Sequence, residues 1–155
     1  MAHARNQPPG IFHLTSRGVD RRRIYDGDET RLCFYRLLDR TLKKHGGRIH
    51  ACCLMTNHYH VVYETTEVGQ LSAALQYLNS TYARIYNEIC GRRGYLFERP
   101  FHSELVTNER HAISVCRYVV NNPVRAGMTA RAGDYRWSSF LATAGLGPKP
   151  PFLTT

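Results

Sequence analysis

The sequence has no long apolar segment. The longest unbroken apolar run among the 155 residues is Ala51–Met55, whereas a membrane-spanning helix needs about 20 apolar residues. The first residues, Met1–Gly10, include charged residues and prolines but no apolar stretch, unlike a signal peptide. These absences exclude an integral membrane protein and favour a cytoplasmic one.

Cysteine is present but without a recognisable pattern. The five cysteines are odd in number and scattered along the chain, and none forms a C-x-x-C pair. We therefore expect neither a disulfide framework nor a structural zinc site. The thiols are typical of small buried apolar residues in a reducing compartment.

Acidic residues are scarce relative to basic ones. Asp and Glu number 12 against 21 Lys and Arg, which gives a formal net charge of +9 with histidine neutral. Most of this charge is arginine, which binds phosphates bidentately and stacks on unpaired bases. Hydrophobic residues make up 43% of the chain, so global disorder is excluded. A nucleic-acid partner is the first expectation, and a merely basic surface is the alternative.

Internal repeats and low-complexity tracts are also absent. Only the two ends, at about 1–10 and 145–155, are rich in proline or glycine, and we expect both to be loose. The length is typical of one domain. We therefore predict a single domain over residues 1–155.

Period-two hydrophobicity predicts four strands, at 11–17, 49–55, 58–63 and 101–106. The second and third are separated only by Thr56 and Asn57. Two residues suffice for a hairpin, and Asn tolerates the positive φ that such turns need. In the first strand Phe12 and Leu14 point to one side, whereas His13 points to the other.

Helical spacing predicts three helices, from about Asp26 to Gly46, from Leu71 to Ile89, and from Glu109 to Asn122. Asp26 with Glu29 resembles a helix start, and Pro123 is expected to stop the third helix. The order β-α-β-β-α-β, followed by a further helix, predicts an α+β fold with a ferredoxin-like split βαβ antiparallel sheet. Its first two helices would cover one face and leave the other for the third helix or a nucleic acid.

His58 and His60 flank Tyr59 at the start of a predicted strand. Because side chains alternate along a strand, both imidazoles leave the same face, opposite Tyr59. Two imidazoles on one face can hold a divalent metal. An ordinary hydrogen-bonded surface pair is the alternative.

Tyr118 and Asn122 are four residues apart on the third predicted helix, so they share one of its faces. Tyr118 lies away from the apolar stripe that contains Cys116 and Val119. An amide oxygen one turn from a phenol could act as a third metal ligand while the phenol addresses the substrate. A packed tyrosine and a helix-ending asparagine are the alternative.

Two longer blocks resemble those of the REP-associated tyrosine transposases, members of the IS200-like, single-tyrosine HUH transposase superfamily. Residues 53–60 read C-L-M-T-N-H-Y-H and resemble the family's C-L-M-x-N-H-x-H block. Residues 117–127 read R-Y-V-V-N-N-P-V-R-A-G and resemble its R-Y-I-x-x-N-P-V-R-A-G block. Shorter matches occur in order at 15–18, 78–82, 96–98 and 135–139, so the resemblance runs from about Gly10 to Phe140.

The resemblance implies a role for each matching residue. His58 and His60 would be the metal-binding HUH pair, Asn122 would complete the metal site, and Tyr118 would be the catalytic nucleophile. The family cleaves and rejoins single-stranded DNA at repeats that fold into hairpins. This chain carries His102 where relatives usually have Lys or Arg, which leaves a DNA contact open at that position. The role of His13 is open as well.

The implied reaction is a transfer of DNA strands through a covalent 5′-phosphotyrosine. A phenol has a pKa of about 10 and is a weak nucleophile at neutral pH, so a divalent cation on the scissile phosphate would assist it. The donor set suits Mg²⁺ or Mn²⁺. No nucleotide cofactor is needed, because the covalent bond keeps the phosphoester energy. We expect a cytoplasmic, nucleoid-associated monomer or homodimer.

Basic residues near aromatic ones complete the predicted DNA-binding surface. The candidate nucleic-acid-binding residues are Arg17, Arg21, Arg22, Arg92, Arg93, Arg99 and Arg125. Arginine binds phosphates while Tyr95 and Phe97 offer faces for unpaired bases. For each single arginine, a solvated surface charge is the alternative.

Two other functions fit parts of the same sequence. A catalytically silent ferredoxin-like module that binds single-stranded nucleic acid would need the basic face but not Tyr118, His58 or His60. A metal-dependent phosphodiesterase that uses water would need the histidines but not the tyrosine. A Tyr118→Phe variant separates the second of these from a tyrosine transposase.

Overall fold

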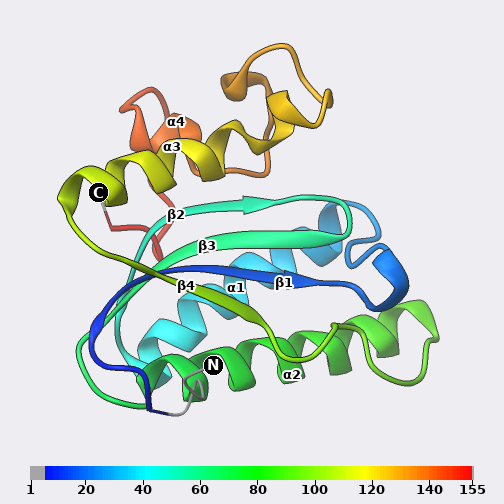
Figure 1. Cartoon of the computed structure of the whole chain (residues 1–155). Helices are drawn as coiled ribbons and strands as arrows, with labels where there is room; N and C mark the ends of the chain where they lie inside the picture. The colour runs from blue at the N-terminus through cyan, green and yellow to red at the C-terminus, as the bar shows by residue number, and fades with distance from the viewer. Residues whose placement is uncertain (1–5, 155) are drawn as a thin grey trace.

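The computed structural model describes residues 6–154. Its elements are β1 (Gly10–Arg17), η2 (Val19–Arg21), α1 (Asp28–His45), β2 (Arg48–Leu54), β3 (His58–Thr65), α2 (Gln70–Cys90), β4 (His102–Val106), α3 (Glu109–Arg125), η3 (Ala132–Asp134) and α4 (Phe140–Thr143). The strands form one antiparallel sheet in the order β2-β3-β1-β4. Helices α1 and α2 lie together on one face, and α3 crosses the other (Figure 1). The predicted ferredoxin-like α+β fold is confirmed, and the third helix occupies the face that was left open.

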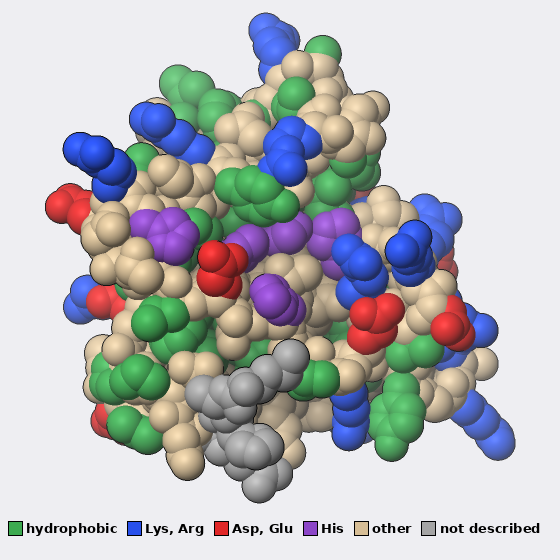
Figure 2. Space-filling view, in the orientation of Figure 1, with side chains coloured by type: hydrophobic (Ala, Val, Ile, Leu, Met, Phe, Trp, Pro, Cys, Tyr) green, Lys and Arg blue, Asp and Glu red, His purple; other side chains and the backbone are tan. Residues whose placement is uncertain are grey.

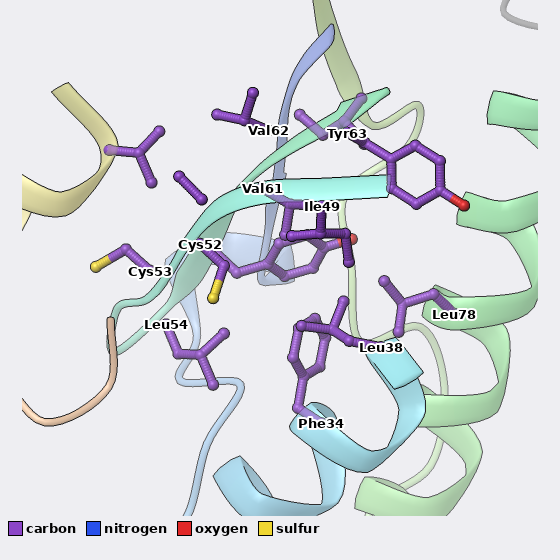
Figure 3. Packing of buried hydrophobic residues seen from close by; sticks show 14 of the residues in the cluster. Phe34, Leu38, Ile49, Cys52, Cys53, Leu54, Val61, Val62, Tyr63 and Leu78 are labelled. Carbon is purple, nitrogen blue, oxygen red and sulfur yellow. The ribbon is translucent and has the colours of Figure 1, made fainter. Parts of the chain in front are cut away.

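The main core lies between the sheet and the α1–α2 layer. Phe34 and Leu38 of α1 and Leu78 of α2 point toward the strands (Figure 3). The ring of Phe34 lies 4.7 Å from that of Tyr59, which is fully buried on β3. Strand alternation therefore directs the odd-numbered side chains of β3 into this core, as predicted.

All five cysteines are free thiols. Cys52 and Cys53 are buried, and Cys33, Cys90 and Cys116 are partly buried. The predicted use of cysteine as a small apolar residue is confirmed. Within residues 6–154, moreover, no helix has the length and apolar character needed to cross a membrane.

Helix α1 begins at Asp28, one residue later than it would if Asp26 were its N-cap. The N-cap is Gly27, with φ 82°, and no side chain caps the helix. The Thr30 hydroxyl instead accepts the Asp26 N–H at 2.8 Å and donates to the Gly27 carbonyl at 3.1 Å. The helix therefore starts close to the predicted place, but Thr30 and not Asp26 provides the side-chain hydrogen bonds of its first turn.

The apolar stripe of α2 departs from prediction at its last turn. Tyr86 is buried, whereas Ile89 is 47% exposed. At this end of the helix the Tyr86 hydroxyl lies 3.5 Å from the Arg23 carbonyl, and Cys90 Sγ lies 3.8 Å from the Asp26 carboxylate. Tyr86 and Cys90 therefore face the segment before α1, and Ile89 lies on the solvent side.

Pro123 does not stop α3, contrary to prediction. The helix continues to Arg125 with Pro123 inside it. Proline lacks the N–H that would bond to the carbonyl four residues earlier, at Val119. The Asn122 amide donates to that carbonyl at 3.4 Å and to the Tyr118 carbonyl at 3.1 Å. This side chain compensates in part for the missing backbone donor, and the helix is maintained for one more turn.

The chain near its end is held to the sheet. Phe152 and Leu153 are buried, and the Thr154 N–H donates to the Ile49 carbonyl at 2.7 Å. The prediction of a loose end at 145–155 is therefore wrong for 152–154, where burial of two large side chains offsets the entropy of ordering. Residue 155, and residues 1–5 of the other predicted loose end, lie outside the described residues.

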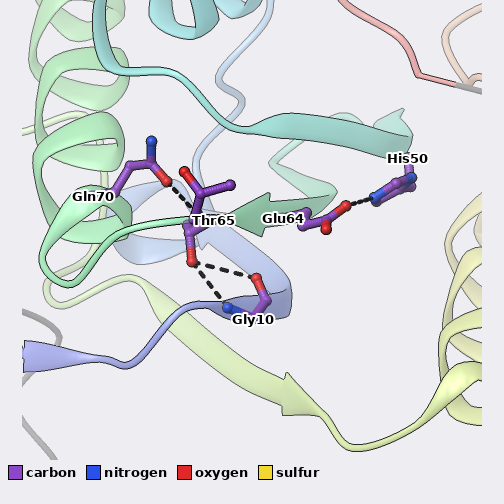
Figure 4. Close-up of polar contacts among 6 residues, drawn as sticks. Gly10, His50, Glu64, Thr65 and Gln70 are labelled. Atoms are coloured by element: carbon purple, nitrogen blue, oxygen red, sulfur yellow. Dashed lines mark hydrogen bonds and ion pairs between the residues drawn. The ribbon is translucent and has the colours of Figure 1, made fainter.

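Polar contacts hold the register of β1 against β3 at one end. The Thr65 hydroxyl accepts the Gly10 N–H at 3.2 Å and donates to the Gly10 carbonyl at 3.3 Å (Figure 4). The His50 imidazole also donates a hydrogen bond to the Glu64 carboxylate at 2.7 Å between β2 and β3 (Figure 4). The resulting register places Thr15 opposite His60 and Arg17 opposite His58. A one-residue slip would move every side chain to the other face.

Candidate active site

A cleft of about 710 Å³ lies between α3 and the face of β1, β3 and β4. Its lining residues are His13, Thr15, Arg17, His60, Glu98, Pro100, His102, Glu104, His111, Ser114, Val115 and Tyr118. Histidine side chains gather across the middle of this face, with basic side chains near them (Figure 2). Polar and titratable groups thus meet in one hollow on the face opposite the aromatic core.

His58 and His60 leave β3 on the same side, as predicted, and His60 lines the cleft. The rings of His58 and His60 are 4.9 Å apart and nearly perpendicular. His60 is only 6% exposed, and His58 is half-buried. The short link before β3 is confirmed as a hairpin, since the Met55 N–H donates to the His58 carbonyl at 2.9 Å.

The hairpin does not use the positive φ expected at Asn57. Within residues 6–154, Asp20 and Arg21 are the only non-glycine residues with positive φ. The Asn57 side chain instead donates to the Arg21 carbonyl at 3.3 Å and accepts from His58 Nδ1 at 2.7 Å. Asn57 therefore connects the hairpin to the basic loop and orients the first HUH imidazole.

The hydrogen bonds of both imidazoles leave Nε2 for a ligand. An amide oxygen only accepts, so His58 Nδ1 carries the proton and Nε2 carries the lone pair. His60 Nδ1 lies 2.9 Å from His13 Nε2 and 3.2 Å from the Thr15 hydroxyl. Metal-binding histidines use their second nitrogen in this way.

The site keeps both imidazoles neutral. Burial, assisted by the positive charge of Arg17, lowers the pKa of His58 to about 4. Burial, followed by His58, His13 and the arginines Arg125 and Arg17, lowers the pKa of His60 to about 3. A neutral imidazole is the form that binds a metal, so the environment suits that use.

Tyr118 of α3 faces His60 and His13. Its ring lies 6.0 Å from that of His60 and 5.7 Å from that of His13, edge-on to both. The Arg125 guanidinium lies 4.2 Å from the centre of the Tyr118 ring. Tyr118 remains 41% exposed, so the structure brings an accessible phenol beside the rings of His60 and His13.

Asn122 lies one turn further along α3. Its NH₂ group bonds to backbone carbonyls of the helix, which leaves the amide oxygen for a ligand. Among the described residues, no group of three or more His, Cys, Asp or Glu is arranged to hold a metal ion. The candidate donors predicted from the sequence are His58, His60 and the Asn122 oxygen, and of these the structure brings His58 and His60 together on β3.

The basic residues divide into two groups. Arg17 lines the cleft and Arg125 covers the Tyr118 ring. Five others, Arg21, Arg22, Arg92, Arg93 and Arg99, belong to the loop after β1 and the segment between α2 and β4. Backbone bonds join these segments, since the Val19 N–H donates to the Leu96 carbonyl at 2.9 Å and the Glu98 N–H to the Arg17 carbonyl at 2.8 Å.

An aromatic side chain is exposed within this basic surface. Tyr95 is 67% exposed, and the Arg99 guanidinium lies 4.5 Å from its ring centre. Arg92 instead donates to the side chain of Asn87 at 3.1 Å. Phe97, the other predicted stacking residue, is buried against Tyr59 and Tyr82, so its proposed contact with bases is wrong and it belongs to the core.

Sequence reasoning did not select several residues of the cleft. His13 and His102 were left without a role, and Thr15 and Glu104 were not chosen as site residues. Glu104 is the cross-strand partner of His13, and His102 that of Thr15. The alternation of β4 could have placed His102 and Glu104 on one face, but no local signal shows which strand lies beside β1.

Comparisons with known proteins agree with this arrangement. The family model described as transposase IS200 like matches residues 9–122. The solved structure of a REP-associated tyrosine transposase bound to a REP hairpin is similar to this chain, with a TM-score of 0.75 and 16% identity. The similarity covers 97% of this chain and 88% of that chain. No curated protein sequence matches. Because the family model spans most of the sequence, the chain belongs to the IS200-like transposase family.

Proposed function

We propose that this transposase cleaves and rejoins single-stranded DNA at hairpin-forming repeats through a covalent phosphotyrosine. The observation that carries the proposal is the convergence of Tyr118 with the HUH face, where its ring lies 6.0 Å from that of His60. The proposed nucleophile Tyr118 and one candidate metal ligand, His60, come from distant parts of the chain and line one cleft. A module that only binds DNA needs no such convergence.

In the proposed reaction the Tyr118 phenolic oxygen attacks the scissile phosphorus in line with the departing 3′ oxygen. The new bond joins the phenolic oxygen to phosphorus, and the bond from phosphorus to the 3′ oxygen breaks. The phenolic proton is lost, and the 3′ oxygen leaves as a hydroxyl after taking up a proton. Attack by a 3′-hydroxyl reverses the step and joins strands, so no nucleotide cofactor is required.

His58 and His60, with the amide oxygen of Asn122, would hold Mg²⁺ or Mn²⁺. When bound, the ion would withdraw electron density from the phosphate and stabilise the charge that develops there. The chain's own contribution is to keep both imidazoles neutral and to direct their Nε2 atoms outward.

The proposed DNA partner is single-stranded or hairpin DNA. The similar solved structure is of a protein bound to a REP hairpin, which supports a hairpin as the partner here. Arg17 beside the HUH face and the exposed pair Tyr95 and Arg99 would contact phosphates and unpaired bases. We further propose that residues 1–155 form one domain that acts as a monomer or homodimer at the nucleoid.

A covalent trapping assay tests the proposal. The protein is incubated with end-labelled hairpin oligonucleotides and Mn²⁺, and a protein–DNA adduct that survives denaturation is measured. We expect an adduct that disappears with a chelator and in Tyr118→Phe, which removes only the phenolic oxygen. Tyr77→Phe is the matched control, because Tyr77 is a partly exposed tyrosine of α2 that lies outside the cleft, and it should still form the adduct.

Two outcomes would contradict the tyrosine mechanism. Cleavage that persists in Tyr118→Phe, without an adduct, would identify water as the nucleophile and the protein as a phosphodiesterase. Tight binding of hairpins without metal, combined with no adduct across a randomised hairpin library, would identify a silent binding module.

A further inference from the structure

His13 is the most buried polar neighbour of the proposed metal site. It is only 9% exposed, on β1, and its Nε2 lies 2.9 Å from His60 Nδ1. The two rings stack with centroids 5.1 Å apart and planes inclined by 27°. A buried histidine pair in this geometry shares one hydrogen bond, so the position of one proton decides that of the other.

The tautomer of His60 determines which of its nitrogens can bind a metal. A neutral imidazole carries one proton, on Nδ1 or on Nε2. Binding through Nε2 requires the proton on Nδ1, and His60 Nδ1 then needs an acceptor. His13 Nε2 is such an acceptor when the proton of His13 is on its own Nδ1.

The surroundings of His13 favour that arrangement. Thr15 also lies within 3.2 Å of His60 Nδ1, but a hydroxyl both donates and accepts, so it does not select a tautomer. Glu104 is the cross-strand partner of His13 and lines the same cleft. Because β1 lies between β3 and β4, the negative charge of Glu104 stands on the side of His13 away from His60, and this charge favours the His13 proton on that side.

We propose that His13 is a positioning residue that accepts the Nδ1 proton of His60 and thereby holds the His60 Nε2 lone pair toward the metal. The proposal rests on the proposed function only in taking His60 as a metal ligand. It assigns His13 no contact with the substrate or with the reacting atoms.

The first test measures the tautomer in metal-free protein. Long-range ¹H–¹⁵N correlation spectra of ¹⁵N-labelled protein in chelator report which nitrogen of His60 carries the proton. We expect Nδ1–H in the wild type and a shift toward Nε2–H in His13→Phe, which keeps a ring but removes the acceptor. His13→Gln should restore Nδ1–H, because its amide oxygen can reach the place of Nε2. Thr15→Val should leave the spectrum of His60 unchanged.

The second test measures Mn²⁺ affinity by electron paramagnetic resonance without DNA. Loss of such an orienting partner weakens metal binding by about 10- to 100-fold, and we expect this for His13→Phe. His13→Gln and Thr15→Val should stay within about threefold of the wild type. The backbone amide ¹H–¹⁵N spectrum shows whether His13→Phe disturbs folding. If it does, His13→Leu makes the same test with a smaller side chain.

Three results would overturn the proposal. They are a wild-type His60 with its proton on Nε2, an unchanged Mn²⁺ affinity in both His13→Phe and His13→Leu, and a larger effect from Thr15→Val than from either. None of these measurements uses DNA or Tyr118. Failure of the trapping assay with success here would therefore reject the proposed strand transfer and leave the positioning role of His13 standing.

Discussion

The two faces of β3 are built from alternate residues of one strand and have opposite chemistry. Tyr59 points into the α1–α2 layer and is fully buried, whereas its neighbour His60 points beneath α3 and is 6% exposed. Both side chains are removed from water, so burial alone does not distinguish them. The aromatic face is stabilised by ring packing, and the histidine face by hydrogen bonds that a buried polar group requires.

One sheet therefore separates a packed apolar face from a polar face that carries the candidate site. Phe34 meets Tyr59 on the helix-covered side, and Tyr118 meets His60 on the other. Changes on the first side should therefore alter the free energy of unfolding, and changes on the second should alter the chemistry of the cleft.

The largest effect is expected from His60→Ala on the adduct. Loss of a proposed metal ligand removes several kcal/mol of stabilisation of the developing charge, so the rate of adduct formation should fall by at least about 100-fold. Quantitative trapping with Mn²⁺ measures the rate. The free energy of unfolding, measured in urea, should change less than the activation free energy of adduct formation. A rate within a few fold of the wild type would show that His60 is not needed for the reaction.

On the other face, Phe34→Ala should chiefly lower stability. Phe34 is fully buried between the rings of Tyr25, Tyr59 and Tyr82, and removal of such a ring costs about 3–5 kcal/mol. Urea denaturation of metal-free protein measures this loss. Mn²⁺ affinity under conditions where the variant stays folded should match the wild type. A weakened affinity in the folded variant would show that the two faces are coupled.

The histidine face should make stability depend on pH in metal-free protein. The pKa of His60 is lowered to about 3 and that of His58 to about 4, below the value of about 6.5 expected for an unfolded chain. As the pH falls below about 6.5, the unfolded chain takes up protons that the folded protein excludes, so stability decreases toward lower pH by about 1.4 kcal/mol per unit for each histidine.

Urea denaturation between about pH 7 and pH 5 measures this slope. His60→Asn should reduce the slope by one histidine's share while leaving the core intact. An equal slope in the variant would mean that His60 takes up its proton in the folded protein as readily as in the unfolded chain.

The smallest expected effect concerns the end of α3. Asn122→Ala should cost about 1 kcal/mol, because the Val119 carbonyl next to Pro123 loses its side-chain donor. In a Pro123→Ala background the backbone N–H is restored, so the same substitution should cost less. A double-mutant cycle by urea denaturation measures the coupling, and additive effects would reject the compensation.

Asn122→Asp separates the two uses of this side chain. The carboxylate keeps an oxygen for the proposed metal but loses both donors to the helix. We expect reduced stability without loss of Mn²⁺ affinity, whereas Asn122→Ala should lower both. If Asn122→Asp weakened Mn²⁺ binding as much as Asn122→Ala, the amide would act through the helix and not as a ligand.

Much of the fold could be predicted because it depends on local periodicity. The alternation of β3, the stripe of α1 around Phe34 and Leu38, and the glycine end at Gly46 were all confirmed. The errors occurred where a tertiary partner or a side chain overrode the local rule. Asn122 maintains the helix past Pro123, and Phe97 packs into the core where a base contact was predicted.

The candidate site was only partly accessible to sequence reasoning. That His58 and His60 share a face follows from the period of a strand, and that Tyr118 avoids the apolar stripe follows from the period of a helix. The place of His13 against His60 does not follow from either, because it depends on which strands are neighbours and in what register.

Local patterns along the chain sufficed to predict the main helices and strands, the side of each on which its reactive residues stand, and the family. Three further features depend on packing between distant segments: α3 lies over the open face of the sheet, Tyr118 lies beside His60, and His13 completes the cluster. The two kinds of feature differ in how far apart along the chain the interacting residues lie. Periodicity is set by neighbouring residues along the chain, whereas register and helix docking are set by packing between segments that the sequence separates.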